Sequence, residues 1–296
     1  MPGTFHKPGR WLRVNTHSHT THSDGAYAPA QAIAHYQNLG YQALAITDHR
    51  VATPTDGLAG ADGDFTVIPG VEIDGVDPET GLYHLVGLGV STDQDFGQDT
   101  PLQQAVDWVN TQGGLAIFAH PYWTGQRHAA LTSVRGAVGV EVYNHVCHMH
   151  NGKPYSLSHW DALLEERQRV WGIASDDTHY RPQYGFGGSG WIMVRAAANT
   201  TDAILAAIRA GDFYASTAPQ IHSVQRDGQV VSVKCSPVVS IAFTGQQWRG
   251  GVVRPPEGQE TITEARYVVT EERFIRVTCT DAAGRKAWSQ PIFFDD

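Results

Sequence analysis

The pattern of apolar and polar residues predicts two regions of different architecture. Up to about residue 215, short apolar runs alternate with segments of helical periodicity, as is typical of repeated strand–helix units. The predicted strands are Leu12–Asn15, Ala43–Thr47, Thr66–Ile73, His84–Val90, Leu115–Ala119, Val138–Tyr143, Val170–Ala174 and Trp191–Val194. The predicted helices are Pro29–Leu39, Thr100–Gln112, Ser158–Arg167 and Asp202–Ala210. We therefore expect residues 1–215 to form an α/β domain.

Residues 216–296 show the shorter alternation of antiparallel strands. The predicted strands are Val230–Cys235, Val239–Phe243, Ala265–Thr270, Phe274–Thr280 and Ala287–Phe294. We expect a small C-terminal antiparallel β domain, similar to a sandwich. Three roles are open for it: restricting access to a site, binding a partner, or completing the core.

Polar side chains with metal-binding chemistry recur at the predicted strand ends. The strand that ends at Asn15 leads to His17 and His19, and Asp48 and His49 follow the next strand. His120 also follows a predicted strand, as do Asp177 and His179. Glu72 lies within a predicted strand and His84 begins one. Because active sites form at the carboxyl ends of parallel strands in α/β barrels, we expect these side chains to converge.

The first of these elements, His17-Ser18-His19, has the spacing of a metal-binding pair. In an extended segment, residues i and i+2 point to one side, so that both imidazoles can reach one ion. Asp24 adds a carboxylate five residues after His19. Two polar loop histidines would give the same local pattern, so the other strand ends decide the interpretation. A mixture of imidazole and carboxylate suits Zn²⁺, Mn²⁺ or Fe²⁺ better than Ca²⁺, which prefers oxygen alone.

Seven short motifs between Asn15 and His179 carry a family resemblance. They are NTHSHTTHSDG, ITDH, PGVEI, HLVGLG, FAHP, EVYN and SDDTH, in that order. In these motifs the chain resembles the polymerase-and-histidinol-phosphatase (PHP) superfamily of metal-dependent phosphoesterases. The resemblance implies a distorted (β/α) barrel of the PHP type for the first domain.

The resemblance also implies three sets of metal ligands. One ion would be held by His17, His19, Glu72 and Asp177. Glu72 would bridge to a second ion held by His84 and His120. A third would be held by Asp24, His49 and His179. Some members have a histidine where Asp24 stands, and Asn15 replaces an aspartate that is frequent in the family.

Composition limits the partners. The formal net charge is −9 and the chain has no run of Lys or Arg, which argues against long nucleic acids as partners. No apolar segment is long enough to span a bilayer, and the N-terminus has no signal-like apolar region. Three cysteines without a CxxC pair fit a reducing cytoplasm. We expect a small-molecule substrate; the oligomeric state is left open.

The leading hypothesis is a hydrolase that cleaves a small phosphate mono- or diester with a hydroxide shared between two ions. Glu72 and Asp177 would be the central catalytic carboxylates, and Arg181 would contact the anionic substrate, since it follows His179 by two residues. Asp48 and Asp176 adjoin ligands and are expected to orient imidazoles. The first alternative is a carboxyl ester or carbamate hydrolase with the same two or three ions, and the second is a non-catalytic metal-binding module.

Overall fold

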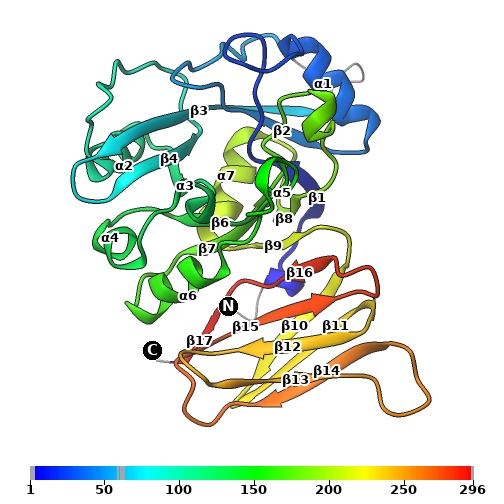
Figure 1. The fold of residues 1–296 in the computed structure, drawn as a ribbon. Coiled ribbons are helices and arrows are strands. Elements are labelled where there is room, and N and C mark those ends of the chain that lie inside the picture. Colours follow the sequence, from blue (N-terminus) through cyan, green and yellow to red (C-terminus); the bar gives the residue numbers. More distant parts are fainter. Residues whose placement is uncertain (1–3, 59, 61–63, 295–296) are drawn as a thin grey trace.

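One large mixed sheet runs through the molecule, as seen in the computed structural model, which describes residues 4–58, 60 and 64–294 (Figure 1). In spatial order its strands are β13 (Gly250–Val253), β12 (Ser240–Thr244), β15 (Phe274–Thr280), β16 (Lys286–Trp288), β9 (Phe213–Ser216), β8 (Trp191–Ala196), β1 (Arg10–Asn15), β2 (Ala43–Ile46), β3 (Thr66–Asp77), β4 (Gly81–Leu88), β5 (Leu115–Phe118), β6 (Gly139–Asn144) and β7 (Trp171–Ser175). The short strand β17 (Ile292–Phe293) pairs with β15 beside this path.

Between β1 and β7, the strands of the large sheet form two parallel blocks. Strands β1, β2 and β3 pair in parallel, as do β5, β6 and β7. Strand β4 lies between the blocks and is antiparallel to both neighbours. The reason is the connection: only residues 78–80 separate β3 from β4, and a turn this short joins antiparallel strands. The prediction of strand–helix units is therefore wrong at β4, and β8 is likewise antiparallel to β1.

Helices flank the strands. They are α1 (Pro29–Asn38), α2 (Leu102–Thr111), α3 (Pro121–Thr124), α4 (His128–Ser133), α5 (His145–Asn151), α6 (Leu157–Glu165) and α7 (Thr201–Ala210), with 3-10 turns η1 (Thr4–His6) and η2 (Pro182–Tyr184). The four predicted helices correspond to α1, α2, α6 and α7. The other three span four to seven residues, too few to show helical periodicity in the sequence. Among the described residues, no helix is long and apolar enough to cross a bilayer.

The strand ladder does not close into a barrel within the described part of the chain. Strand β7 is an edge strand of the large sheet, and no other strand of the described residues pairs with its outer edge. Beyond the strand ends, however, Ser18 and Thr178 form an isolated parallel bridge, and the His19 backbone N–H donates to the Thr178 carbonyl over 2.9 Å. The expectation of a distorted barrel is thus corrected to an open mixed sheet whose first and last parallel blocks approach each other at the Ser18–Thr178 bridge. That point carries the polar strand ends.

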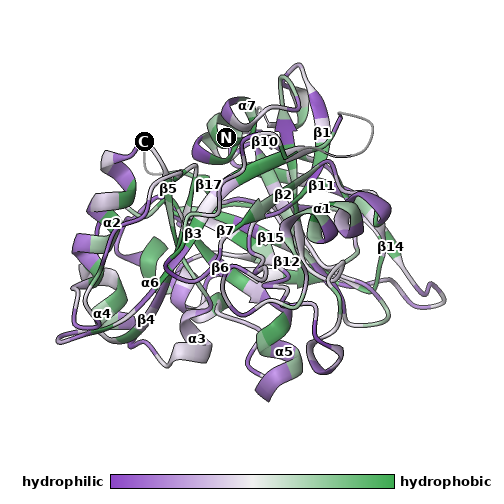
Figure 2. Cartoon of the chain, turned by 90° about the horizontal axis from the view of Figure 1, so that it is seen from above, coloured by the Kyte–Doolittle hydropathy of each residue, from purple (hydrophilic) through white to green (hydrophobic). Residues whose placement is uncertain are grey.

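The C-terminal strands form a second layer. Strands β10 (Ile221–Asp227), β11 (Val230–Val238) and β14 (Ile262–Val268) pair antiparallel in a separate sheet. Their apolar faces share a buried cluster with β12 and β15, which includes Val231, Ile241 and Ile275. Figure 2 shows the central strands as largely hydrophobic and the outlying loops as hydrophilic. The predicted strand Ala287–Phe294 is two short strands, β16 and β17, which are separated at Pro291.

Strand pairing and side-chain hydrogen bonds connect the residues before position 215 with those after it. Strand β16 pairs with β9, so that the large sheet continues across residue 215. Arg276 on β15 binds both carboxylate oxygens of Asp161 on α6 at 2.8 Å. The side chain of Gln290 pairs with the backbone of Gly172 on β7, accepting at 2.8 Å and donating at 2.9 Å. The division into domains at residue 215 stays a prediction.

Candidate metal centre

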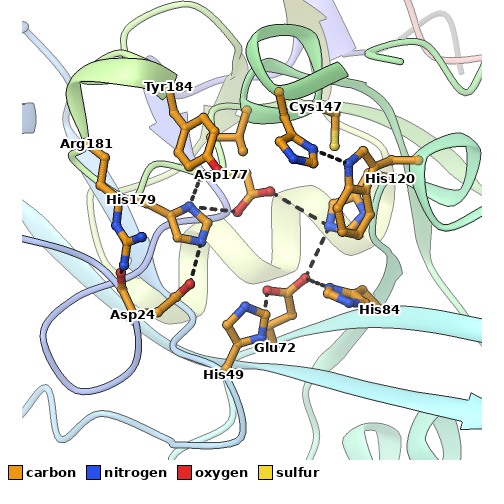
Figure 3. A pocket seen from close by; sticks show the side chains of 13 residues that line it. Asp24, His49, Glu72, His84, His120, Cys147, Asp177, His179, Arg181 and Tyr184 are labelled. Atoms are coloured by element: carbon orange, nitrogen blue, oxygen red, sulfur yellow. Dashed lines mark hydrogen bonds and ion pairs between the residues drawn. The ribbon is translucent and has the colours of Figure 1, made fainter. Parts of the chain in front are cut away.

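The polar residues at the strand ends lie together in one cluster. Strands β1, β2, β5 and β7 each stop within one to four residues of a candidate ligand, while Glu72 and His84 lie within the paired strands β3 and β4. Two of these residues are held in left-handed backbone conformations, His120 at φ 31° and Asp177 at φ 54°. Such conformations cost about 1–3 kcal/mol each in non-glycine residues and concentrate at functional sites. Figure 3 shows the imidazoles and carboxylates pointing toward one another across the pocket.

The most buried part of the cluster, here called the inner set, consists of His17, His19, Glu72 and Asp177. The Nε2 atoms of His17 and His19 are 3.2 Å apart, and each lies 3.1 Å from Glu72 Oε2. Asp177 Oδ1 lies 3.3 Å from His17 Nε2 and 3.0 Å from His19 Nε2. Four atoms held tetrahedrally at about 2.0–2.2 Å from one ion would lie about 3.3–3.6 Å apart. The inner set therefore has nearly the spacing that a single ion requires.

The second predicted set surrounds the other oxygen of Glu72. Glu72 Oε1 lies 2.8 Å from His84 Nδ1 and 3.3 Å from His120 Nε2. His49 Nδ1 is also close, 3.3 Å from Oε2. One carboxylate thus faces the inner set with one oxygen and a further pair of imidazoles with the other.

The third predicted set, here called the outer set, consists of Asp24, His49 and His179. His179 Nε2 lies 3.3 Å from Asp24 Oδ2. The structure adds His19, whose ring offers a ligand atom within 4.8 Å of those of the other three residues. The inner and outer sets predicted from the sequence are therefore each brought together in space. The second set is divided: the structure groups His84 with His49 and Glu72, and His120 with His17 and Glu141. The role of every set in holding an ion remains a proposal.

Glu141 on β6 belongs to the cluster and was not predicted. Its Oε1 lies 2.8 Å from His17 Nδ1 and accepts from the Ser175 hydroxyl at 2.6 Å. Its Oε2 accepts from the His120 backbone N–H at 3.0 Å and from the Asn144 amide at 2.9 Å. Because a bond at Nδ1 fixes the ring, the Nε2 atom of His17 faces the inner set. The available signal was a glutamate in an otherwise apolar strand, since a buried charge requires partners.

The predicted roles of the aspartates that precede two ligands are wrong. Asp48 accepts from the Thr20 backbone N–H at 2.6 Å and from the Ser23 hydroxyl at 2.6 Å, and no imidazole of the described residues bonds to it. Asp176 accepts from the backbone N–H groups of Gly188, Ser189 and Gly190, each at 2.8 Å. Both aspartates therefore anchor loops beside the cluster, and they do not orient its rings.

The electrostatics of the cluster favour bound positive charge. Burial lowers the pKa of His19, but hydrogen bonds to Asp177 and Glu72 outweigh it and raise that pKa to about 9. The pKa of His17 is raised well above its usual value, because the charges of Asp177, Glu72 and Glu141 overcome its burial. Burial also opposes ionisation of Glu72, yet the surrounding imidazoles hold the pKa of its carboxyl well below its usual value. Without metal, these carboxylates hold protons on the imidazoles; a divalent cation can replace them.

The donor atoms also fit a metal. Within the described part of the chain, the buried Nδ1 atoms of His19 and His120 have no hydrogen-bond partner, and that of His49 makes no hydrogen bond although it lies 3.3 Å from Glu72 Oε2. Buried polar atoms without partners are rare and costly in folded proteins. Nitrogen donors combined with carboxylates suit Zn²⁺, Mn²⁺ or Fe²⁺. The cluster therefore has the composition and spacing of a divalent metal centre.

A pocket opens above the cluster. It has a volume of about 220 Å³ and is lined by Asp24, His49, Glu72, His84, His120, Trp123, Val146, Cys147, His150, Asp177, His179, Arg181 and Tyr184. Arg181 lies at this pocket, and its Nη2 donates to the backbone carbonyl of Asp24 over 2.5 Å (Figure 3). Its contact with a substrate stays a prediction. Because candidate ligands line an open cavity, the centre is accessible from solvent, as in catalytic metal sites.

Comparison with known proteins gives structural likeness alone. No family model matches the chain, and no curated protein is significantly similar to it. A solved structure from Bacteroides vulgatus, a two-domain protein containing a predicted PHP-like metal-dependent phosphoesterase, matches with a TM-score of 0.54 at 16% identity, covering 97% of this chain and 95% of that one.

Two further structures match part of the chain. An amidohydrolase from Chromobacterium violaceum has a TM-score of 0.42 at 18% identity, over 56% of this chain and 87% of its own. A proposed metal-dependent phosphoesterase from Bifidobacterium adolescentis has a TM-score of 0.44 at 14% identity, over 61% of this chain and 93% of its own. Of the three, the Bacteroides vulgatus structure covers nearly the whole chain, and it shows that the two proteins share a fold.

Proposed function

We propose that the chain is a metal-dependent hydrolase that cleaves small phosphate mono- or diesters. The observation that carries this proposal is the position of Glu72, which is 1% exposed and surrounded by imidazoles. Ring nitrogens of five histidines lie within 3.3 Å of its oxygens, namely those of His17, His19, His49, His84 and His120. A carboxylate with both oxygens so placed can serve two ions at once.

The proposed cofactors are two or three divalent ions, Mn²⁺, Zn²⁺ or Fe²⁺. The inner set would hold one, Glu72 with His84 and His120 a second, and the outer set a third. Bound ions of this kind supply a water-derived nucleophile near neutral pH and neutralise charge on phosphoryl oxygens. Glu72 and Asp177 would fix the ions relative to each other, while Glu141 fixes the ring of His17.

Arg181 would orient the substrate. Its guanidinium uses one N–H for the Asp24 carbonyl, and a guanidinium has five such donors. No other side-chain hydrogen bond of Arg181 is found among the described residues, and its remaining donors suit the oxygens of a phosphate ester. A neutral carboxyl ester would gain little from this charge, which is why phosphorus is favoured as the electrophile. The alternatives remain a carboxyl ester or carbamate hydrolase with the same centre, and a non-catalytic metal-binding module.

The test compares esters that differ in the acid alone. Protein loaded with Mn²⁺ or Zn²⁺ should hydrolyse an aryl phosphate with a higher kcat/KM than the acetate of the same phenol, and inorganic phosphate should inhibit competitively. Arg181→Ala should raise KM for the phosphate ester more than for the acetate. Arg254→Ala, a change at an exposed arginine of the C-terminal region, is the matched control. Preference for the acetate without inhibition by phosphate would favour the carbonyl alternative; no turnover of either would favour the non-catalytic one.

A further inference from the structure

One wall of the pocket is a row of three aromatic rings, here called the aromatic arch: Trp123 from α3, His150 from α5 and Tyr184 from η2. The ring centroids of Trp123 and His150 are 5.9 Å apart, and those of His150 and Tyr184 are also 5.9 Å apart. The indole N–H of Trp123 donates to His150 Nδ1 over 3.1 Å. Three short elements that are separate in the sequence thus contribute one continuous aromatic surface.

Both ends of the arch contact candidate metal ligands. Trp123 packs edge-on against His84 and His120, with centroid distances of 5.6 and 5.2 Å. Tyr184 packs edge-on against His179 at 6.2 Å. A molecule attached to a phosphoryl group at the metal centre would therefore lie directly against these rings. The arch is part of the same pocket as the ligands and forms its least polar side, together with Val146 and Cys147.

The remaining lining limits the charge and size of that molecule. Among the described residues that line the pocket, Arg181 is the only lysine or arginine, while Asp24, Glu72 and Asp177 are acidic. A second anionic group on the substrate would find no further lysine or arginine among these residues. The volume of about 220 Å³ is also below the roughly 300–1,000 Å³ of sites that take drug-sized ligands. These features favour a compact leaving group without additional negative charge.

We propose that the aromatic arch is a subsite for a single flat, uncharged ring in the leaving group of a phosphate monoester. This inference rests on the proposed phosphoesterase function and adds the class of alcohol to it. A planar ring can stack on or pack edge-on against Trp123 and Tyr184, and such pairs contribute beyond the burial of apolar area. A puckered ring of equal size buries similar area but lacks the aromatic contribution. We therefore expect the subsite to bind a planar ring more tightly than a puckered ring of equal size.

The experiment measures binding of two phosphonates of equal charge and nearly equal size. Benzylphosphonate and cyclohexylmethylphosphonate are titrated calorimetrically into the Mn²⁺-loaded protein, with methylphosphonate as the probe of the phosphoryl position. Benzylphosphonate should bind about two- to tenfold more tightly than the cyclohexyl compound. Trp123→Leu should bring this ratio close to one without changing the affinity for methylphosphonate.

The matched control is Tyr122→Leu, which removes the neighbouring aromatic ring; Tyr122 is 45% exposed and does not line the pocket. It should keep the wild-type ratio. If Trp123→Leu does not fold, Tyr184→Leu tests the other end of the arch. Equal affinities for the two ring compounds in the wild-type protein would overturn the inference and leave the phosphoesterase proposal intact. Failure of methylphosphonate and inorganic phosphate to bind at all would overturn the proposed function itself.

Discussion

The inner and outer sets use the same kinds of donor but differ in burial. Side-chain exposure is 0% for His17 and His19, 1% for Glu72 and 7% for Asp177. In the outer set it is 48% for Asp24, 27% for His49 and 12% for His179. Charges that are shielded from water interact more strongly. The comparison teaches that one cluster can offer two unequal sites, and we expect an ion to be held strongly at the buried one and to exchange at the exposed one.

The two sets also differ in what positions them. The inner set comes from strand β3 and from segments directly bonded to strand ends, such as the Ser18–Thr178 bridge. Asp24 lies on a loop that is fixed by Asp48 on one side and by Arg181 on the other. Ala26 N–H also donates to the His179 carbonyl over 2.9 Å. Ordering a loop ligand costs conformational entropy that a strand ligand does not, so the outer ion should be the weaker one.

The largest effect is expected for Glu72→Gln. It removes the negative charge that faces five imidazoles, and breaking such a buried network costs about 3–5 kcal/mol, or roughly 150- to 4,000-fold in affinity. Binding of the inner ion and of the second ion, proposed to be held with His84 and His120, should both weaken, and turnover should fall with them. Metal content of the purified variant, measured by elemental analysis, checks this. His222→Ala, which changes an exposed histidine on β10, should keep full occupancy; equal losses in the two variants would contradict the assignment.

The second prediction concerns how metal affinity and the stability of the metal-free protein depend on pH. The pKa of His19 in the metal-free protein is about 9, so an ion must displace its proton at neutral pH. Affinity for the inner ion should therefore rise about tenfold per pH unit for each displaced proton between pH 7 and 9. The stability of the metal-free protein should instead fall over this pH range. The raised pKa of His19 stabilises the fold fully below its unfolded value of 6.5, and this contribution is lost as pH rises through about 9.

Paired measurements check this prediction. Metal titrations at pH 7, 8 and 9 give the affinity, and thermal unfolding of the metal-free protein gives its stability over the same range. Affinity that is independent of pH, or metal-free protein that gains stability toward pH 9 from this group, would contradict the proposed inner site.

Glu141→Gln should have a smaller, selective effect. Glu141 bonds His17 Nδ1 and does not face the outer set. Loss of such a supporting carboxylate typically costs 10- to 100-fold in metal affinity. Isothermal titration should show a weaker inner ion, with the outer ion nearly unchanged. A variant that weakens the outer ion more than the inner one would reverse the comparison between the two sets.

The smallest effect is expected for Arg181→Ala on the outer ion. Removing one hydrogen bond to the Asp24 carbonyl should reduce the affinity for that ion about two- to tenfold, as expected from a hydrogen bond of about 0.5–1.5 kcal/mol. Inner occupancy should be unaffected. Arg181→Lys should restore part of the loss, since a lysine can donate to the same carbonyl. A loss of the inner ion in Arg181→Ala would show that the two sets are not independent.

The sequence predicted the donor cluster better than the sheet. The spacing of His17 and His19 predicts that both rings point to one side, and their Nε2 atoms do lie 3.2 Å apart. Period-two geometry is local, so it can be read from the chain. The antiparallel position of β4 depends on a short turn at residues 78–80, whereas the open edge at β7 depends on packing between distant segments. Glu141 was missed for the latter reason, since its partner His17 lies 124 residues away.

The most direct test is elemental analysis of gently purified protein before and after timed dialysis against a chelator. The proposed centre predicts two or three ions of Mn, Zn or Fe per chain, with one leaving early and the remainder retained by the buried inner donors. Re-addition of Mn²⁺ or Zn²⁺ should restore the full content. Less than one ion per chain, with no uptake and no gain of hydrolytic activity on adding either metal, would contradict the metal centre itself; simultaneous loss of all ions would contradict the difference between the inner and outer sets.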